Sequence, residues 1–241
     1  MKKLARKFLR RYIDNPEIVL GFPPHGTFWS SLGPIGQNYS QSKRSIELAR
    51  EMLEIGIRSL NRDLSHMLRK SENSVDREVI TSTFGEHYKF LEELSYSMQP
   101  NLAIEIGTHR GLGTLALSKY SKKTITFDIV PWKQFNGTLL RESDFCAIEQ
   151  KVTDLSLKGE WDKNINSFRN ADIVFLDGPK NGKFEGIVLP LLLQNMKRNS
   201  ILIIDDIRFL NMIGLWKSIE MPKFDATSFA HYSGTGVVRI L

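Results

Sequence analysis

The chain has 241 residues, 41% of them hydrophobic and 10% aromatic, so it is long enough to bury a substantial core. No apolar run approaches the roughly 18 residues that a membrane helix needs, and the single Cys146 excludes an internal disulfide bond. We therefore expect a globular protein of a reducing compartment, the cytoplasm.

The net charge of +6 is concentrated at the N-terminus. Six of the 33 basic residues precede the first acid, and the other 27 are matched by 27 acids. The body of the chain is thus neutral, which argues against DNA or RNA as a substrate. Residues 2–14 have helical periodicity, with Leu4, Phe8 and Tyr12 in one stripe. We expect this helix to pack on its own protein, and peripheral contact with an anionic membrane is the alternative.

Residues 1–95 are expected to form a mostly helical extension that covers a cleft or builds a homo-oligomer. Its segments are predicted as a loop at 19–37, a helix at 41–69, a polar loop at 71–83 and a helix at 87–98. Gly56 could divide the first of these two helices, whose apolar stripe would be core or a dimer seam.

A strand, a glycine-rich turn and a helix follow one another at 102–120. Glu105 stands near the end of the apolar strand, and three glycines come after it: Gly107, Gly111 and Gly113. Glycine allows a sharp turn and a close approach of a ligand to the backbone. This order is typical of a nucleoside-binding α/β unit, with the ligand at the carboxyl end of the strand. The pattern E-x-G-x-x-x-G-x-G differs from the G-x-G-x-x-G of dinucleotide-binding proteins.

Strands and helices continue to alternate beyond residue 120, as in a parallel sheet covered on both faces. Further strands are expected at 124–128, in a short segment that ends near Asp154, at 171–177 and at 201–206. Helices are expected at 139–149, 184–196 and 211–219. Too few residues separate the last two strands, 224–231 and 236–241, for a crossover helix, so they should pair antiparallel. We expect a Rossmann-like α/β domain at 96–241, with a mostly parallel seven-stranded sheet and an antiparallel closing hairpin.

Asp128 closes the second strand 21 residues after Gly107. An acid at this distance commonly binds ribose, because its two oxygens match a vicinal diol. Asp154 follows the third strand in a comparable position. Trp132 is a candidate for stacking on the adenine, with a partly buried surface aromatic as the alternative.

Three more acids close the fourth and fifth strands: Asp177, Asp205 and Asp206. The carboxyl ends of parallel strands face the same cleft. Two carboxylates ~4 Å apart repel by about 4 kcal/mol at a surface-like dielectric, which a divalent cation would relieve. Oxygen ligands suit Mg²⁺. Consecutive residues of an extended strand point to opposite faces, so both Asp205 and Asp206 reach the cleft only if the strand ends between them. An acid that caps a helix is the alternative.

The glycine pattern resembles motif I of the class I S-adenosylmethionine (SAM)-dependent methyltransferases. The resemblance implies that Glu105 helps to hold the amino-acid end of SAM and that Asp154 contacts the adenine amine. It also implies a loop that admits the sulfonium region, formed by Gly107, Thr108, Gly111 and Gly113. The expected fold is then that of a SAM methyltransferase.

The later acids resemble those of two metal-dependent groups, the catechol-type O-methyltransferases and the macrocin-type sugar methyltransferases. In both, the metal is held by an acid closing strand four, here Asp177, and an adjacent pair closing strand five, here Asp205 and Asp206. The catechol enzymes carry Asp-x-x-Lys with the lysine as general base, and Asp177-Gly-Pro-Lys180 matches this pattern. As a base, Lys180 would need its pKa to fall from ~10.4 toward 7–8. An exposed turn lysine is the alternative.

On this reading the protein is a SAM-dependent O-methyltransferase. It would move a methyl group to a hydroxyl of a small molecule, assisted by Mg²⁺, with Asp177 and Lys180 as the catalytic residues. A metal-independent small-molecule methyltransferase and a non-catalytic SAM-binding interaction module are the alternatives.

Overall fold

The structure is a computed structural model in which residues 43–72, 74–82, 85–230 and 233–241 are described. The predicted basic helix at 2–14 and the loop at 19–37 lie outside the described residues. Among the described residues, no helix combines the length and the apolar character that crossing a membrane requires.

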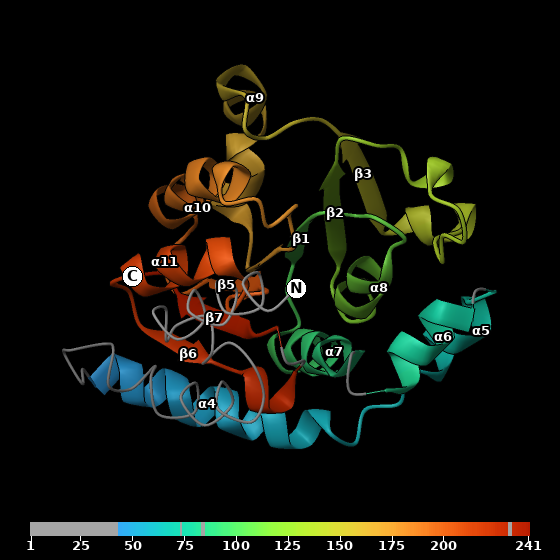
Figure 1. Ribbon diagram of the computed structural model, residues 1–241, viewed down its shortest axis with the longest axis horizontal. Helices are drawn as coiled ribbons and strands as arrows, with labels where there is room; N and C mark the ends of the chain where they lie inside the picture. The colour runs from blue at the N-terminus through green and yellow to red at the C-terminus, as the bar shows by residue number, and fades with distance from the viewer. Residues whose placement is uncertain (1–42, 73, 83–84, 231–232) are drawn as a thin grey trace, which may run out of the picture.

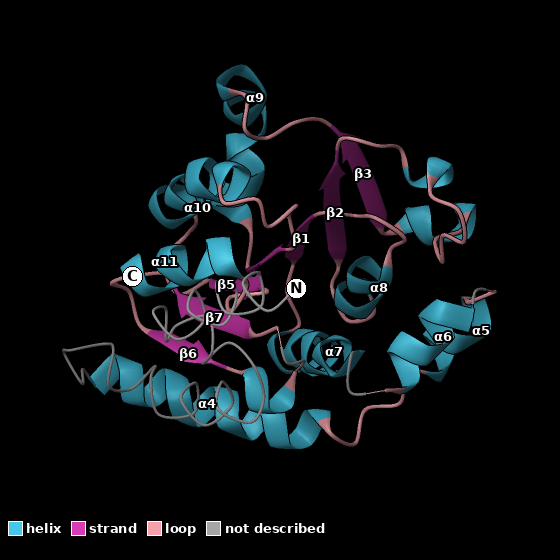
Figure 2. Cartoon of the chain, in the orientation of Figure 1, coloured by secondary structure: helices cyan, strands magenta, loops and turns pink. Residues whose placement is uncertain are grey.

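A seven-stranded sheet forms the centre of the molecule, with the strand order β3-β2-β1-β4-β5-β7-β6 (Figure 2). The strands are β1 Leu102–Ile106, β2 Lys123–Asp128, β3 Ile148–Val152, β4 Ile173–Leu176, β5 Ile201–Asp205, β6 Lys223–Asp225 and β7 Thr235–Arg239. The first five are parallel, and β7 runs antiparallel to both β5 and β6. The predicted parallel sheet and its antiparallel closing hairpin are therefore confirmed.

Helices cover both faces of the sheet (Figure 1). One face is covered by α9 Lys158–Asn170, α10 Lys183–Asn195 and α11 Leu210–Ser218, and the other by α4 Lys43–Ser59, α7 Glu86–Met98 and α8 Leu112–Ser118. Strand β5 illustrates this burial on both faces. Leu202 and Ile204 join the core under the first group of helices, whereas Ile201 and Ile203 join the core under the second group. A strand buried on both faces must be aliphatic at every position.

The N-terminal helices differ in part from the prediction. The helical segment expected at 41–69 is two helices, α4 and α5 Ser65–Lys70, and the break comes after Ser59. Gly56 is no division point, because it lies inside α4, where a Cβ would collide with the ring of Phe229. The predicted domain boundary after residue 95 falls within α7, whose apolar face belongs to the same core as the strands.

Three predictions of secondary structure are wrong. The polar segment expected as a loop at 71–83 contains helix α6 Ser74–Thr81. The helix expected at 139–149 is a 3₁₀ turn, Glu142–Cys146, followed by β3. Leu139 and Leu140 are apolar because they are buried beneath α8, not because they line a helix. The strand expected at 224–231 ends at Asp225, where the Asp225 carboxylate accepts a hydrogen bond from the Thr227 amide (3.0 Å) and turns the chain.

Candidate functional site

Glu105 lies beneath the glycine-rich loop that joins β1 to α8. Its side chain is buried and accepts hydrogen bonds from the hydroxyls of Thr114 in α8 and Thr126 in β2, the latter at 2.7 Å. Burial raises the pKa of Glu105 to about 8, although both hydroxyls act in the opposite direction. The carboxyl group therefore connects strand and helix under the loop and does not line the cavity described below.

The loop has the glycines that its backbone demands. Gly107 has φ +111°, and a Cβ there would collide with the carbonyl oxygen of Asp177, which directly follows the neighbouring strand β4. Gly111 has φ +89° immediately before α8, and a Cβ would collide with Leu140. Left-handed backbone of this kind favours glycine. Thr108 is buried between them, and its hydroxyl lies 2.8 Å from that of Thr126. The loop is thus held tightly against strands β2 and β4.

Asp128 joins the end of β2 to this loop. Its Oδ2 accepts a hydrogen bond from the His109 amide (2.9 Å), and its Oδ1 accepts one from the Val130 amide (3.1 Å). A carboxylate has about four acceptor positions, so each oxygen keeps one for a further donor. Asp154 also keeps acceptor capacity. Its Oδ1 accepts hydrogen bonds from the amide and the hydroxyl of Ser156, whereas its Oδ2 accepts none from the described residues.

A cavity of about 760 Å³ lies along the carboxyl ends of β1, β2 and β4. Asp128 lines it at the end of β2, Asp154 lines it after β3, and Asp177 and Lys180 line it after β4. Its apolar wall is formed by Phe127, Ile129, Phe135, Leu155, Phe184 and Ile187. The volume lies within the usual range for a site that encloses a cofactor or small ligand. Trp132 is not part of this wall, because its ring stacks on Phe145 with 5.1 Å between the centroids.

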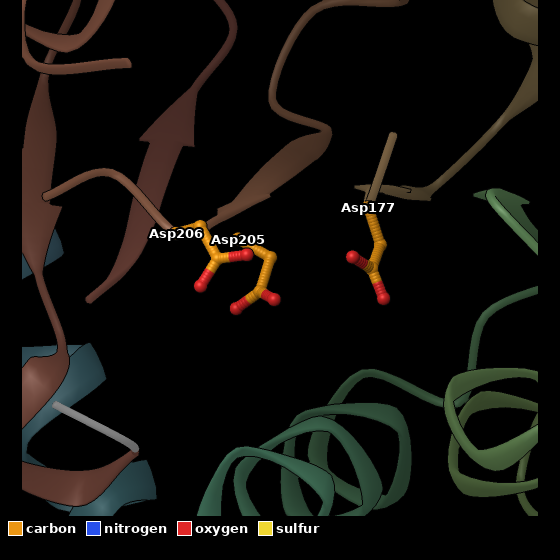
Figure 3. A group of neighbouring side chains, drawn as sticks. All are labelled: Asp177, Asp205 and Asp206. Carbon is orange, nitrogen blue, oxygen red and sulfur yellow. The ribbon is translucent and has the colours of Figure 1, made fainter. Parts of the chain in front are cut away.

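The three acids that follow β4 and end β5 converge (Figure 3). One oxygen from each of Asp177, Asp205 and Asp206 lies within 4.8 Å of the others. Asp205 is the last residue of β5, and Asp206 has a left-handed backbone with φ +56°. Because the strand ends between them, the two consecutive side chains face the same cluster. Such a backbone costs a non-glycine residue roughly 1–2 kcal/mol, so the surrounding structure must hold it in place.

Lys180 is inserted into this cluster. Its ammonium pairs with Asp177, lies 3.1 Å from Oδ2 of Asp206 and 3.7 Å from Oδ2 of Asp205. Burial alone would lower the pKa of Lys180, but the attraction of the three aspartates outweighs it and raises the pKa. The fall of this pKa toward 7–8 that a general base would need is therefore not met while Lys180 is paired with the three aspartates. Burial raises the pKa of Asp177 to about 6, against the pull of Lys180.

Comparison with known proteins rests on structure, since no family model and no curated protein sequence matches this chain. An O-methyltransferase from Bacillus cereus in complex with SAH aligns over 83% of this chain and 92% of its own, with 13% identity and a TM-score of 0.51. The O-methyltransferase TomG from Streptomyces achromogenes, solved with SAM, aligns over 74% of this chain and 91% of its own, with 13% identity and a TM-score of 0.49. The chain has the class I SAM methyltransferase fold.

Two positioning residues of this methyltransferase fold were missed by sequence reasoning. Glu185, buried in the first turn of α10, accepts hydrogen bonds from the amides of Lys180 (2.7 Å) and Gly182 (3.0 Å). Asp76 of α6 pairs with Arg110 of the glycine-rich loop. An acid three residues into a helix, after the turn residues Asn181 and Gly182, is a recognised capping signal and could have indicated Glu185. No local signal indicates Asp76, because its partner is distant in sequence.

Proposed function

We propose that the protein is a SAM-dependent methyltransferase that acts on a hydroxyl group of a small molecule. One observation carries this proposal: in a methyltransferase fold, a single cavity is lined by the two acids suited to a nucleoside and by the acid and lysine suited to the chemistry. The Bacillus cereus protein that aligns with this chain is an O-methyltransferase solved with SAH, which supports the same assignment.

The residues present fit SAM. Asp128 keeps an acceptor position on each oxygen for the ribose diol, and Asp154 has an oxygen left for an amine donor. The apolar side chains Ile129, Leu155 and Phe184 suit the adenine ring, and Gly107 lines the cavity where we place the sulfonium region. Bound SAM supplies a methyl group that is already electrophilic. The work of this chain is then to align the acceptor oxygen and to exclude water.

The three aspartates fit a hard divalent cation such as Mg²⁺. They offer only carboxylate oxygens, which lie close enough together to share one ion. Asp177, Asp205 and Asp206 would hold it, and it would lower the pKa of a bound hydroxyl. We assign Asp177 and the neighbouring aspartates to orienting the acceptor. We assign Lys180 to receiving its proton, which requires that the lysine first leave its ion pairs and lose its own proton.

Two experiments test the proposal in sequence. Calorimetry with SAM, and with NAD as the negative control, tests the cofactor site in the presence of Mg²⁺ and of EDTA. Methyl transfer to a panel of catechols, diols and sugars then tests catalysis. Binding of NAD but not SAM would contradict the assignment. Binding of SAM without transfer to any acceptor would favour the non-catalytic SAM-binding module.

A metal-independent methyltransferase is the second candidate, and a specific contact favours it. The Lys180 ammonium already compensates part of the negative charge of the three aspartates. Methyl transfer that is equally fast in Mg²⁺ and in EDTA would support this candidate, whereas turnover that depends on added Mg²⁺ would exclude it.

A further inference from the structure

The ammonium of Lys180 occupies the centre of the tri-aspartate cluster, defined here as Asp177, Asp205 and Asp206. It makes an ion pair with each of the three. The side chain of Lys180 is only 16% exposed. The lysine thus takes the place of a cation among oxygens that would otherwise repel one another.

The main chain of Lys180 is held by contacts that do not involve its ammonium group. Glu185 accepts a hydrogen bond from the Lys180 amide (2.7 Å), and the backbone at Lys180 is left-handed with φ +53°. A strained backbone at a site persists only where its surroundings enforce it. The four-carbon side chain is flexible, and Lys180 lines the open cavity. Rotation of this side chain would carry the ammonium from the cluster toward the cavity, while the contacts of the main chain would stay in place.

A divalent cation bound in the cluster would repel this ammonium. An ion bound by these carboxylates lies about 2.0–2.6 Å from each ligand oxygen. The Nζ atom lies 3.1 Å from an oxygen of Asp206 and 3.7 Å from one of Asp205. Two positive charges would then lie a few ångströms apart in a buried site, where repulsion is strong.

We propose that Lys180 is a built-in competitor of the metal ion: its ammonium holds the three aspartates together until a divalent cation displaces it into the cavity. The inference rests on the metal site of the proposed function and adds its regulation. Lys180 then lowers the apparent metal affinity, because every metal ion must break its ion pairs. A lysine that merely sits beside the metal site would have no such effect.

Calorimetry with Mn²⁺ alone tests the competition, using Lys180→Met and the matched control Lys183→Met. Lys183 is an exposed lysine that lines the same cavity and has no ion pair to the cluster among the described residues. We expect Lys180→Met to bind Mn²⁺ at least about tenfold more tightly than the unchanged protein. Lys183→Met should bind Mn²⁺ as tightly as the unchanged protein does. Equal or weaker binding by Lys180→Met, with Mn²⁺ still bound by the unchanged protein, overturns the competition and leaves the metal site standing. Failure of every variant to bind Mn²⁺ overturns both.

A second measurement uses the unchanged protein and does not depend on the folding of a variant. The extent of acylation of Lys180 and Lys183 by a lysine-specific reagent is measured by mass spectrometry, with and without Mn²⁺. Displacement into the cavity predicts that labelling of Lys180 rises with Mn²⁺ while labelling of Lys183 stays constant. Labelling of Lys180 that is unchanged or reduced by Mn²⁺ overturns the proposal.

Discussion

Asp76 and Arg110 form an ion pair that ties helix α6 to the glycine-rich loop. The distance between Asp76 Oδ1 and Arg110 Nη2 is 2.6 Å, and the Asp76 side chain is completely buried. The Arg110 carbonyl in turn accepts a hydrogen bond from the Leu139 amide (2.9 Å). A short polar helix that does not line the cavity is thereby connected to the backbone that we assign to the cofactor.

We expect Asp76→Asn to weaken both the fold and the binding of SAM. The change leaves a partly buried guanidinium without its counter-charge, so the free energy of unfolding should fall by about 1–3 kcal/mol. Because the glycine-rich loop loses an anchor, the dissociation constant for SAM should rise. Chemical denaturation and calorimetry measure the two effects. Asp162→Asn, at an exposed position of α9, is the control and should change neither. Unaltered SAM affinity in Asp76→Asn would show that α6 does not support the loop.

Asp177 and Asp128 line one cavity, yet their substitution should affect different properties, the rate of methyl transfer and the affinity for SAM. We expect Asp177→Asn to lower the rate of methyl transfer by about 100-fold or more, with SAM affinity nearly unchanged. We expect Asp128→Asn to weaken SAM binding, because one oxygen that could accept a ribose hydroxyl becomes an amide donor. Calorimetry with SAM and turnover at saturating SAM separate the two. Full activity in Asp177→Asn would remove Asp177 from the mechanism.

The parts of the fold that follow from local pattern were predictable from the sequence. Strand β5 is aliphatic throughout because both of its faces are covered. The short connection before β7 allows only an antiparallel partner. In contrast, the position of Trp132 is decided by its contact with Phe145, and helix α6 is supported by Asp76, whose partner is 34 residues away. Contacts of this kind leave no periodic trace in the sequence.

The candidate site was predictable in its residues but not in its geometry. The order of acids along the strands indicated Asp177, Asp205 and Asp206. Whether Asp205 and Asp206 face the same way depends on a left-handed backbone at Asp206, which the sequence does not specify. The pairing of Lys180 with the three carboxylates, which raises its pKa, was not predicted, because the sequence of a turn does not indicate which side chains fold around its lysine.

Glu185 should control the loop that carries Lys180. Its two carboxylate oxygens accept bonds from two amides, those of Lys180 and Gly182. In Glu185→Gln one amide loses its acceptor, which should reduce the free energy of unfolding by about 1–3 kcal/mol. The rate of methyl transfer should fall while SAM affinity changes little. Glu220→Gln, at an exposed position, serves as the control. A rate equal to that of the unchanged protein would mean that the loop is held by other contacts.

Glu105 should make stability depend on pH in an unusual direction. Burial raises its pKa to about 8, from an ordinary value of 4.5, so between these values the folded state holds a proton that the unfolded state has lost. Its contribution to stability is therefore fully present below about pH 4.5 and is lost as the pH rises through about 8. The slope is at most about 1.4 kcal/mol per pH unit, that of one proton.

Glu105→Gln isolates this contribution, because glutamine resembles the protonated acid and does not titrate. We expect the variant to gain stability relative to the unchanged protein as the pH rises from 5 toward 8, measured by chemical denaturation at each pH. Glu220→Gln should show no such trend. A difference between Glu105→Gln and the unchanged protein that stays constant over this range would show that Glu105 is ionised in the folded state. The hydroxyls of Thr114 and Thr126 would then stabilise its carboxylate more than burial disfavours it.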